Sequence, residues 1–216
     1  MAYLTVALAK GRLAKDTMKR LRAAGMAQAV DMDSRKLVFR DELDGIEYLL
    51  VKPVDVVTYV NEGVADIGIV GKDIILEQDL DVYELLDLQF GKCAFAIAGF
   101  PGTDLYGPEK ILKIATKFPN ITKKYFTNKR EVEIIYLNGS VELAPLMKMS
   151  DAIVDLVETG STLKENGLVI LEKMFDIQAK MISNRTSYQF CYNKIQAFIK
   201  AIESEVNDNA TDYLWE

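Results

Sequence analysis

A buried-strand pattern that runs directly into a turn of small polar residues is the feature that most constrains this chain. Residues 152–157 are almost all apolar, which is typical of a strand buried on both faces. Residues 158–162 follow with the sequence Glu-Thr-Gly-Ser-Thr, and a helical pattern begins there. We therefore expect a strand, a short turn and a helix at the carboxyl edge of a parallel α/β sheet.

This turn carries the groups that bind a phosphate. Its hydroxyls and backbone N–H groups can donate hydrogen bonds, the following helix begins with a positive end, and Gly160 lets the backbone come close. Asp155 and Glu158 would repel a phosphate, so we expect them to accept hydrogen bonds from sugar hydroxyls or to hold a cation. A phosphorylated ribose meets both demands. The alternative is an ordinary turn whose Thr and Ser side chains only cap a helix.

The composition limits the chemistry that is available. The chain has 216 residues, enough for one large domain or two small ones, and it contains no histidine. Imidazole general bases, Ser-His triads and zinc sites built on histidine are therefore excluded. A net charge of −6 argues against a broad nucleic-acid surface, but a few cations can still dominate one pocket. Carboxylates, lysines, arginines, hydroxyls or substrate groups must carry any reaction.

The N-terminal residues lack the basic start, long apolar run and cleavage site of a signal peptide, and no stretch reaches transmembrane length. We expect a cytoplasmic protein with no membrane or nucleic-acid partner. Cys93 falls in an apolar strand pattern and Cys191 on an apolar helix face. Both are expected to be small buried side chains, although the sequence leaves a disulfide between them open.

The first half of the chain alternates strand and helix, which predicts a mostly parallel sheet. In chain order, we expect strands at 4–8, 37–39, 46–51 and 65–70 and helices at 13–24 and 53–63. Another strand-to-helix turn contains Lys72 and Asp73. Ligands of open parallel sheets gather at the carboxyl ends of the strands, where the turns at Lys10, Lys72 and Thr159 would lie.

Cations follow the first strand and precede the second. Lys10 and Arg12 flank Gly11 directly after residues 4–8, and Arg35 precedes residues 37–39. Arginine can hold a diphosphate by its planar fork and lysine by its point charge. Such a pair by itself is more often a solvated turn.

The second half repeats the α/β alternation. We expect strands at 93–99, 114–118 and 132–137, helices at 108–113, 119–128 and 141–146, and strand-like runs between 168 and 184. A last helix would carry one apolar stripe through Tyr188, Cys191, Ile195, Phe198 and Ile202. The expected domains are residues 1–91 with about 184–216, and residues 92–183, which carry the Thr-Gly-Ser-Thr turn.

Several motifs taken together resemble a known family. They are ALAKGRL, YVNEGVADIGIVGKD, IATKFPNIT, NGSVELAP and DAIVDLVETGSTLKENGL. They resemble ATP phosphoribosyltransferase, the first enzyme of histidine biosynthesis, from the first strand to about Asn184. The last motif is the most specific, because it joins an acidic pair, the small-residue turn and an Asn-Gly helix stop.

The resemblance implies a fold and a reaction. The fold would be two α/β domains around a central cleft, like a type II periplasmic binding protein. The reaction would join N1 of the ATP adenine to C1′ of phosphoribosyl pyrophosphate (PRPP) and release pyrophosphate. Magnesium would be held mainly by the substrate phosphates, with no metal ligand expected from the protein.

The resemblance also assigns roles to residues. Lys10, Arg12 and Arg35 would act on the departing pyrophosphate, and Asp155, Glu158 and Glu142 would face the ribose hydroxyls. The remaining PRPP contacts would be Thr159, Gly160, Ser161, Thr162 and Leu163, with Gly11, Lys72 and Asp73 as further candidates. These residue types suit a displacement at an anomeric carbon, which needs a stabilised polyanion and a stabilised oxocarbenium-like centre. No nucleophilic side chain is required, so the absence of histidine is no obstacle.

Two departures from the family pattern stand out. Lys148-Met149-Ser150 occupies a position where the family more often has Gly-Leu-Ala or Gly-Leu-Ser, so we expect a different bend before the next strand. The chain also ends without the C-terminal regulatory domain of long-form enzymes. It resembles the short form, which works in a hetero-oligomer with a regulatory subunit related to histidyl-tRNA synthetase.

Two other functions fit the same residues. One is a non-enzymatic ligand-binding protein on the same scaffold, since fold does not fix function. The other is a phosphoribosyltransferase that acts on a different base.

Overall fold

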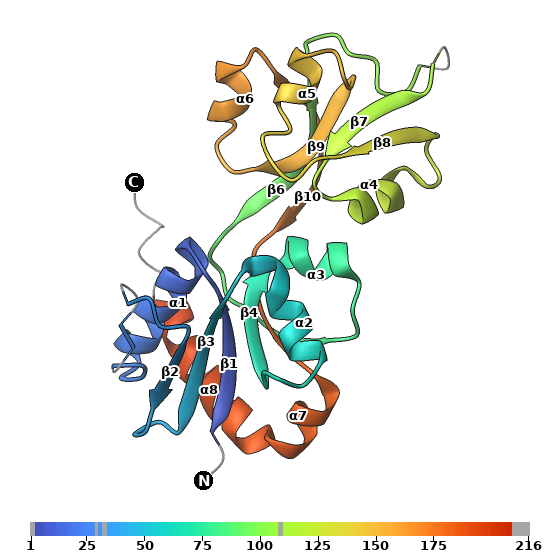
Figure 1. Cartoon of the computed structure of the whole chain (residues 1–216). Helices are drawn as coiled ribbons and strands as arrows, with labels where there is room; N and C mark the ends of the chain where they lie inside the picture. The colour runs from blue at the N-terminus through green and yellow to red at the C-terminus, as the bar shows by residue number, and fades with distance from the viewer. Residues whose placement is uncertain (1–2, 29, 32–33, 108–109, 209–216) are drawn as a thin grey trace. The chain divides into compact units, whose positions relative to one another are not determined.

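The computed structural model describes residues 3–28, 30–31, 34–107 and 110–208, with side chains described as far as Glu203. The chain divides into two compact units. The first comprises Met1–Gly91 and Gln178–Glu216, and the second comprises Lys92–Ile177. Each unit contains one sheet with helices on both faces (Figure 1).

The sheet of the first unit mixes parallel and antiparallel strands. Its order is β2 (Val38–Asp41), β3 (Ile46–Val51), β1 (Leu4–Ala9), β4 (Ile67–Gly71), β11 (Ala179–Ser183) and β5 (Tyr83–Asp87). The pairs β1–β3 and β1–β4 are parallel, and the other three pairs are antiparallel. The prediction of a mostly parallel sheet was therefore wrong. A hairpin adds β2 at one edge, and the returning chain adds β11 in the opposite direction to β4.

Helices cover this sheet on two sides, as Figure 1 shows. The apolar residues of α1 (Arg12–Ala23) and α8 (Tyr192–Asp208) pack on one face with β1, β3 and β4. On the other face lie a 3-10 turn (Pro53–Asp55), α2 (Val56–Asn61) and α3 (Lys72–Gln78). Both faces of the central strands are thus buried, which accounts for their nearly continuous apolar sequences.

Helix α1 forms where the sequence predicts it. Ala14, Met18 and Leu21 are buried on one face, at the spacing that a helix brings together. The helix stops before Gly25, whose φ of 81° lies in the left-handed region, and Met26 N–H donates to Leu21 O at 2.8 Å. This is the helix end that glycine favours.

The last part of the chain forms two helices rather than the single one expected. α7 spans Arg185–Phe190, and α8 begins at Tyr192 after a break at Cys191. Asn184 caps α7 by accepting a hydrogen bond from Ser187 N–H at 2.7 Å. Beyond the break, the stripe predicted for the helix packs into the core of the first unit through Ile195, Phe198 and Ile202. Cys93 and Cys191 form no disulfide bond, and both are half-buried rather than buried as expected.

Asp66 anchors the returning chain to the first unit. Its carboxylate accepts hydrogen bonds from Thr5 N–H at 2.9 Å and from the Ser187 hydroxyl at 2.6 Å. Its carbonyl accepts from the Ser183 hydroxyl at 2.7 Å. The first unit resumes at Gln178, and these contacts hold the returning chain beyond that point.

The sheet of the second unit has the order β10 (Val169–Ile177), β6 (Cys93–Gly99), β9 (Ala152–Val157), β7 (Leu112–Thr116) and β8 (Val132–Tyr136). Strands β9, β7 and β8 are parallel to one another. Strand β6 is antiparallel to both of its neighbours, β9 and β10. The short helices α5 (Leu143–Leu146) and α6 (Ser161–Glu165) lie on one side of this sheet, and α4 (Pro119–Phe126) lies on the other (Figure 1).

Two predictions for this unit were wrong. The expected helix at 108–113 is absent from its described part, because Leu112 and Lys113 already belong to β7 and residues 110–111 are not helical. Leu112 is buried and Lys113 exposed, the alternation of a strand. Strand β9 is fully buried only over its first three residues, and Asp155 onward is half-buried.

No helix within the described ranges is both long enough and apolar enough to cross a membrane.

Helix α5 ends at the Lys148-Met149-Ser150 segment, in a turn whose backbone conformation is the one that glycine usually adopts. Lys148 has a φ of 58°, in the left-handed region, and Met149 N–H donates to Ala144 O at 2.8 Å. This position of a helix end usually holds glycine, because side chains with a Cβ are strained there. The lysine thus adopts the backbone that a glycine takes without strain.

We predict that Lys148→Gly raises the free energy of unfolding by up to about 1 kcal/mol, because it removes left-handed strain. The matched control is Lys123→Gly on the exposed side of α4, which should lower stability by about 1 kcal/mol, since glycine is unfavourable inside a helix. Urea unfolding of both variants measures the two changes. Equal losses in both would show that Lys148 is not strained.

Candidate functional site

A pocket of about 320 Å³ opens where β9 ends in the second unit. It is lined by the eight residues that the family resemblance assigns to the ribose and the 5-phosphate of PRPP: Glu142, Asp155, Glu158, Thr159, Gly160, Ser161, Thr162 and Leu163. Its remaining lining residues come from β6 and β9. A single pocket therefore brings together a carboxylate pair, a third carboxylate from the segment before α5, and a turn rich in hydroxyls.

The pocket exists because its floor is made of small residues. Ala96 and Ala98 on β6 are the cross-strand partners of Asp155 and Ile153 on β9, so all four side chains lie on one face of the sheet. Two methyl groups leave open the space that larger side chains would fill. Leu163 closes the far side as a buried residue of α6.

The turn after β9 has a backbone that depends on glycine. Gly160 has a φ of 72° and precedes α6. The hydroxyls of Thr159 and Ser161 lie 3.0 Å apart, within one exposed cluster. Helix α6 has only five residues, so its dipole is small, and the hydroxyls and N–H groups of the turn are the main donors for an anion.

The Asn-Gly sequence stops α6 as the pattern predicts. The Asn166 side chain donates to Thr162 O at 2.8 Å, and Gly167 has a φ of 71°. Leu168 N–H then donates to Leu163 O at 2.9 Å. The turn is therefore held at both ends, by β9 before it and by this helix stop after it.

Asp155 has a cationic neighbour that the sequence analysis did not single out. Its Oδ1 accepts a hydrogen bond from Leu156 N–H at 2.8 Å and lies 3.3 Å from Lys117 Nζ. Lys117 follows β7, which runs parallel to β9 with Thr116 opposite Val154. The signal was present in the motif IATKFPNIT, but only the pairing of β7 with β9 shows that Lys117 reaches Asp155.

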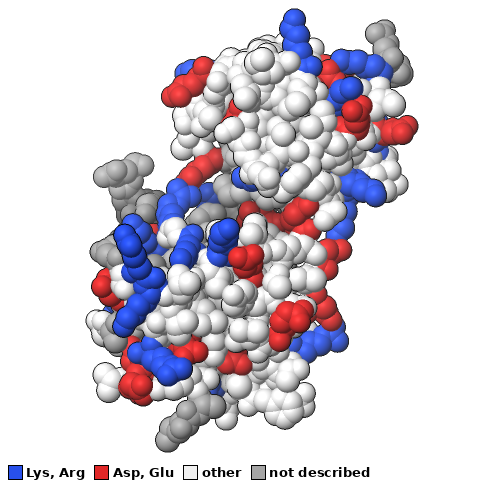
Figure 2. Space-filling view, viewed as in Figure 1, with Lys and Arg blue, Asp and Glu red and all other residues white. Residues whose placement is uncertain are grey.

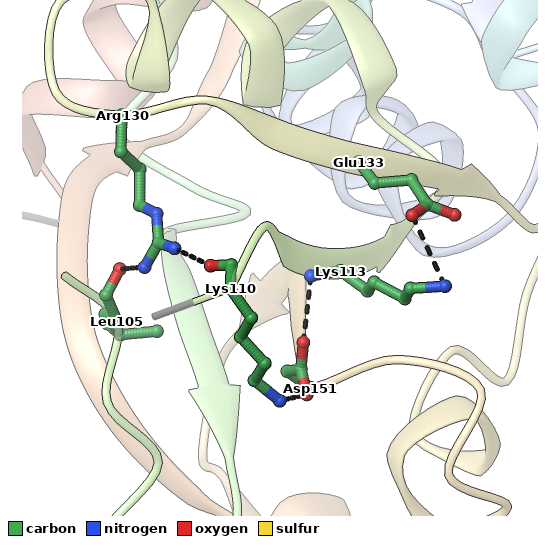
Figure 3. Close-up of polar contacts among 6 residues, drawn as sticks. All are labelled: Leu105, Lys110, Lys113, Arg130, Glu133 and Asp151. Atoms are coloured by element: carbon green, nitrogen blue, oxygen red, sulfur yellow. Dashed lines mark hydrogen bonds and ion pairs between the residues drawn. The ribbon is translucent and has the colours of Figure 1, made fainter. Parts of the chain in front are cut away.

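Polar contacts also fix the start of β9. The Asp151 carboxylate accepts hydrogen bonds from Lys110 Nζ and, at 3.0 Å, from Lys113 N–H (Figure 3). Arg130 donates to Lys110 O and to Leu105 O (Figure 3). Lys110 is therefore held through its backbone by Arg130 and through its side chain by Asp151. Burial alone would raise the pKa of Asp151, but these donors outweigh it, and the pKa lies below its usual value.

The predicted cations of the first unit lie at one edge of its sheet. Lys10 and Gly11 follow the carboxyl end of β1, and Arg12 is exposed in the first turn of α1. Gly11 has a φ of 112°, which side chains with a Cβ rarely adopt. The first turn of α1 contains no acidic residue and has no side-chain cap. Its N-terminus therefore combines a helix dipole with an arginine, an arrangement that attracts anions.

Two further cations share this edge. Lys10 N–H donates to Val51 O at 2.8 Å, so Lys52, directly after β3, lies beside Lys10 along the backbone. Arg35 precedes β2, whose start also lies at the carboxyl end of β3, because Leu50 N–H donates to Leu37 O. Figure 2 shows Lys and Arg side chains gathered on the first unit where β1 and β3 end. The sequence analysis missed Lys52, because only strand pairing places it there.

Lys72 and Asp73 begin α3 at the same edge, after β4. Lys72 is ion-paired with Glu84, which also lies 3.4 Å from Lys180 Nζ. Much of the Lys72 charge is thus offset within the first unit.

A larger pocket, of about 650 Å³, lies at the amino ends of β1 and β3. Its lining includes the apolar Met26 and Phe198, the acidic Glu42 and Asp44, and one lysine, Lys194. Both pockets contain carboxylates, but of the two only the lining of the pocket at β9 includes a Thr-Gly-Ser-Thr turn, whose hydroxyls and N–H groups can donate to a phosphate. Chemistry rather than volume therefore identifies the pocket at β9 as the candidate site. Among the described residues, no group of three or more acidic or cysteine side chains could hold a metal ion.

The fold matches a known class. The periplasmic aliphatic sulphonate binding protein SsuA from Escherichia coli superposes with a TM-score of 0.61 over 98% of this chain and 75% of its own, at 12% identity. This likeness concerns the fold alone. Fold and site together define a two-unit α/β protein of the type II periplasmic-binding-protein architecture with a polar pocket suited to a sugar phosphate.

Closer relatives are more specific. An ATP phosphoribosyltransferase from Clostridioides difficile is 57% identical over 204 residues, covering 94% of this chain and 98% of the relative. A solved structure described as the ATP phosphoribosyl transferase (HisG:HisZ) complex from Thermotoga maritima has a TM-score of 0.83 at 36% identity, covering 95% of this chain and 99% of that one. The profile of the HisG family, described as ATP phosphoribosyltransferase, matches residues 52–204. The chain belongs to the ATP phosphoribosyltransferase family.

We predict that Asp151→Asn flattens the pH dependence of stability at acidic pH. A carboxyl whose pKa is lowered by folding contributes stability above its unfolded pKa, near 3.8, and loses it as the pH falls through the lower folded value. Thermal unfolding between pH 2.5 and 7 should therefore show a steeper acid loss in the wild type than in the variant. Parallel curves would show that the contacts in Figure 3 do not stabilise the charged form.

Proposed function

We propose that this chain is the catalytic subunit of an ATP phosphoribosyltransferase. It joins N1 of the adenine of ATP to C1′ of PRPP, which yields phosphoribosyl-ATP and pyrophosphate in the first step of histidine biosynthesis. The observation that carries the proposal is the pocket at β9, which collects three carboxylates and the Thr-Gly-Ser-Thr turn in a chain of this family.

The second unit would bind the phosphorylated ribose. The turn from Thr159 to Thr162 offers hydroxyls and N–H groups to the 5-phosphate, and Gly160 allows close approach of the backbone. Asp155 and Glu158 accept hydrogen bonds from the ribose hydroxyls, with Glu142 on the same pocket wall. The carboxylates also stabilise positive charge that develops on the ribose ring as the bond to pyrophosphate breaks.

The first unit would receive the leaving group. Lys10, Arg12 and Arg35 belong to the edge where β1 and β3 end and α1 begins, and their charges suit a diphosphate. Adenine N1 attacks C1′ directly, so the protein supplies orientation, which is worth about 7–11 kcal/mol in favourable cases, and electrostatic stabilisation.

Magnesium fits this site only as a partner of the substrate phosphates. The Oδ1 atom of Asp155 already has a lysine 3.3 Å away, which disfavours a directly bound cation. When bound to the phosphates, magnesium would reduce the repulsion between the two polyanionic substrates.

We also infer that the chain works in a hetero-oligomer with a regulatory subunit related to histidyl-tRNA synthetase, in the cytoplasm. The Thermotoga maritima relative was solved as a HisG:HisZ complex, and the present chain covers 99% of the matched chain of that complex. Such a subunit would carry the histidine feedback control of the hetero-oligomer.

The direct test is to supply the purified chain, with and without the regulatory subunit, with ATP, PRPP and magnesium. We expect pyrophosphate and phosphoribosyl-ATP in equal amounts. Saturable binding of a ligand without turnover in either preparation would instead support a binding protein on the same scaffold. Competition by a free nucleobase, with turnover of that base, would support a phosphoribosyltransferase of different specificity.

We predict that Arg12→Ala lowers kcat about a hundredfold or more, on the scale seen when one donor to a transition-state anion is removed. The matched control is Lys19→Ala, another exposed cation of α1 that lies further along the helix. It should leave kcat unchanged. Steady-state kinetics measure both, and an unaltered kcat in Arg12→Ala would remove this residue from the leaving-group site.

We predict that Thr162→Val weakens PRPP binding with little change in stability, because this exposed hydroxyl lines the pocket and packs in no core. Thr127→Val, at an exposed hydroxyl just after α4, is the control and should leave the PRPP Kd unaltered. Isothermal titration gives the two Kd values, and thermal unfolding checks the fold. Equal PRPP affinity in wild type and Thr162→Val would contradict the assignment.

A further inference from the structure

Lys117 is held in place by its neighbours on both sides. The buried hydroxyl of Thr116 donates to Val154 O at 2.7 Å and accepts from Phe118 N–H at 2.9 Å. Thr116 and Phe118 are both buried, and the Phe118 ring lies 5.0 Å from Lys117 Nζ. The backbone that carries Lys117 is therefore clamped to β9, one residue before Asp155.

The two carboxylate oxygens of Asp155 differ in their contacts. Within the described part of the chain, Leu156 N–H and Lys117 Nζ both approach Oδ1, at 2.8 and 3.3 Å. The carboxylate is thereby fixed in orientation, and Oδ2 is the oxygen available to a ligand in the pocket. A carboxylate held through one oxygen presents the other in a constant direction, as accurate positioning of a substrate requires.

Charge gives Lys117 a second effect. Asp155 shares the pocket with the turn proposed to bind a phosphate, and its negative charge opposes that binding. A lysine beside Asp155 offsets this repulsion without removing the acceptor oxygen. The side chain of Asp155 is 20% exposed and that of Lys117 is 38% exposed, so water screens the pair only in part.

We propose that Lys117 is a positioning residue for the substrate sugar: it orients Asp155 through Oδ1, so that Oδ2 accepts from a ribose hydroxyl, and it offsets the repulsion between Asp155 and the phosphates. This inference rests on the proposed function, because it takes PRPP as the ligand of the pocket. Lys117 acts through Asp155 and does not itself contact the ligand.

A double-mutant cycle tests this coupling, with PRPP as the titrated ligand. Lys117→Met should raise the PRPP Kd about fivefold, the upper range for a partly exposed ion pair, whereas Lys117→Arg should stay within about twofold of wild type. In an Asp155→Asn background, Lys117→Met should change the Kd by less than about twofold, because the charge on which it acts is gone. The KM for ATP should remain unchanged throughout.

The chain offers a matched control in Lys113→Met. Lys113 lies on β7, the strand that Lys117 follows, and is ion-paired with Glu133, also at 3.3 Å, but its partner Glu133 is not part of the pocket lining. Its removal takes away the same charge and should leave the PRPP Kd unaltered. Thermal unfolding of each variant verifies the fold, and Lys117→Gln serves as a second variant that keeps the polar side chain if Lys117→Met is unstable.

Each outcome decides the proposal. An equal loss of affinity from Lys117→Met in the wild-type and Asp155→Asn backgrounds would mean that Lys117 contacts PRPP directly, which overturns the positioning role. An unchanged Kd in Lys117→Met, or an equal loss in Lys113→Met, overturns it as well. A wild-type chain that binds no PRPP would overturn the proposed function together with this inference, whereas normal wild-type turnover with unaffected Lys117 variants overturns only the latter.

Discussion

The parallel pairing of β7 with β9 is the constraint on which the site depends. The Thr116 hydroxyl bridges Val154 O and Phe118 N–H, so the ends of both strands are fixed at the same level of the sheet. Because both strands end at one edge, the turn after β9 and the cation after β7 meet there. The antiparallel neighbour β6 contributes only small side chains at this level, and the pocket forms in the space they leave.

An acidic chain can still handle polyanions when its cations are grouped. The net charge is −6, yet Lys10, Arg12 and Lys52 follow or flank the carboxyl ends of β1 and β3 in the first unit. In the second unit, the acidic Asp155 is paired with Lys117, which moderates its field. Local arrangement rather than net charge therefore sets the potential that a phosphate meets.

Sequence reasoning predicted the features that neighbouring residues determine. It failed for the features that depend on which strands pair. The Thr-Gly-Ser-Thr turn and the Asn166-Gly167 helix stop were predictable, because neighbouring residues determine both. Lys117 was missed because its partner Asp155 is distant in sequence. The two residues come together only because β7 pairs with β9. The prediction of a mostly parallel sheet was wrong for the same reason: β2 and β11 pair antiparallel to β3 and β4, and the apolar patterns of the strands do not reveal the direction of pairing.

The two passages of the chain between the units lie against each other. Ala179 N–H donates to Phe90 O at 3.0 Å, and Leu88 N–H donates to Ala179 O at 3.0 Å, so the outgoing and returning segments form a short two-stranded ribbon. The second unit is consequently an insertion into the first. The segments that lead into it and out of it are hydrogen-bonded to each other. A chain that joined the two segments directly would still thread the first sheet in its present order. The first unit is therefore completed by two segments of the chain, one on each side of the second unit.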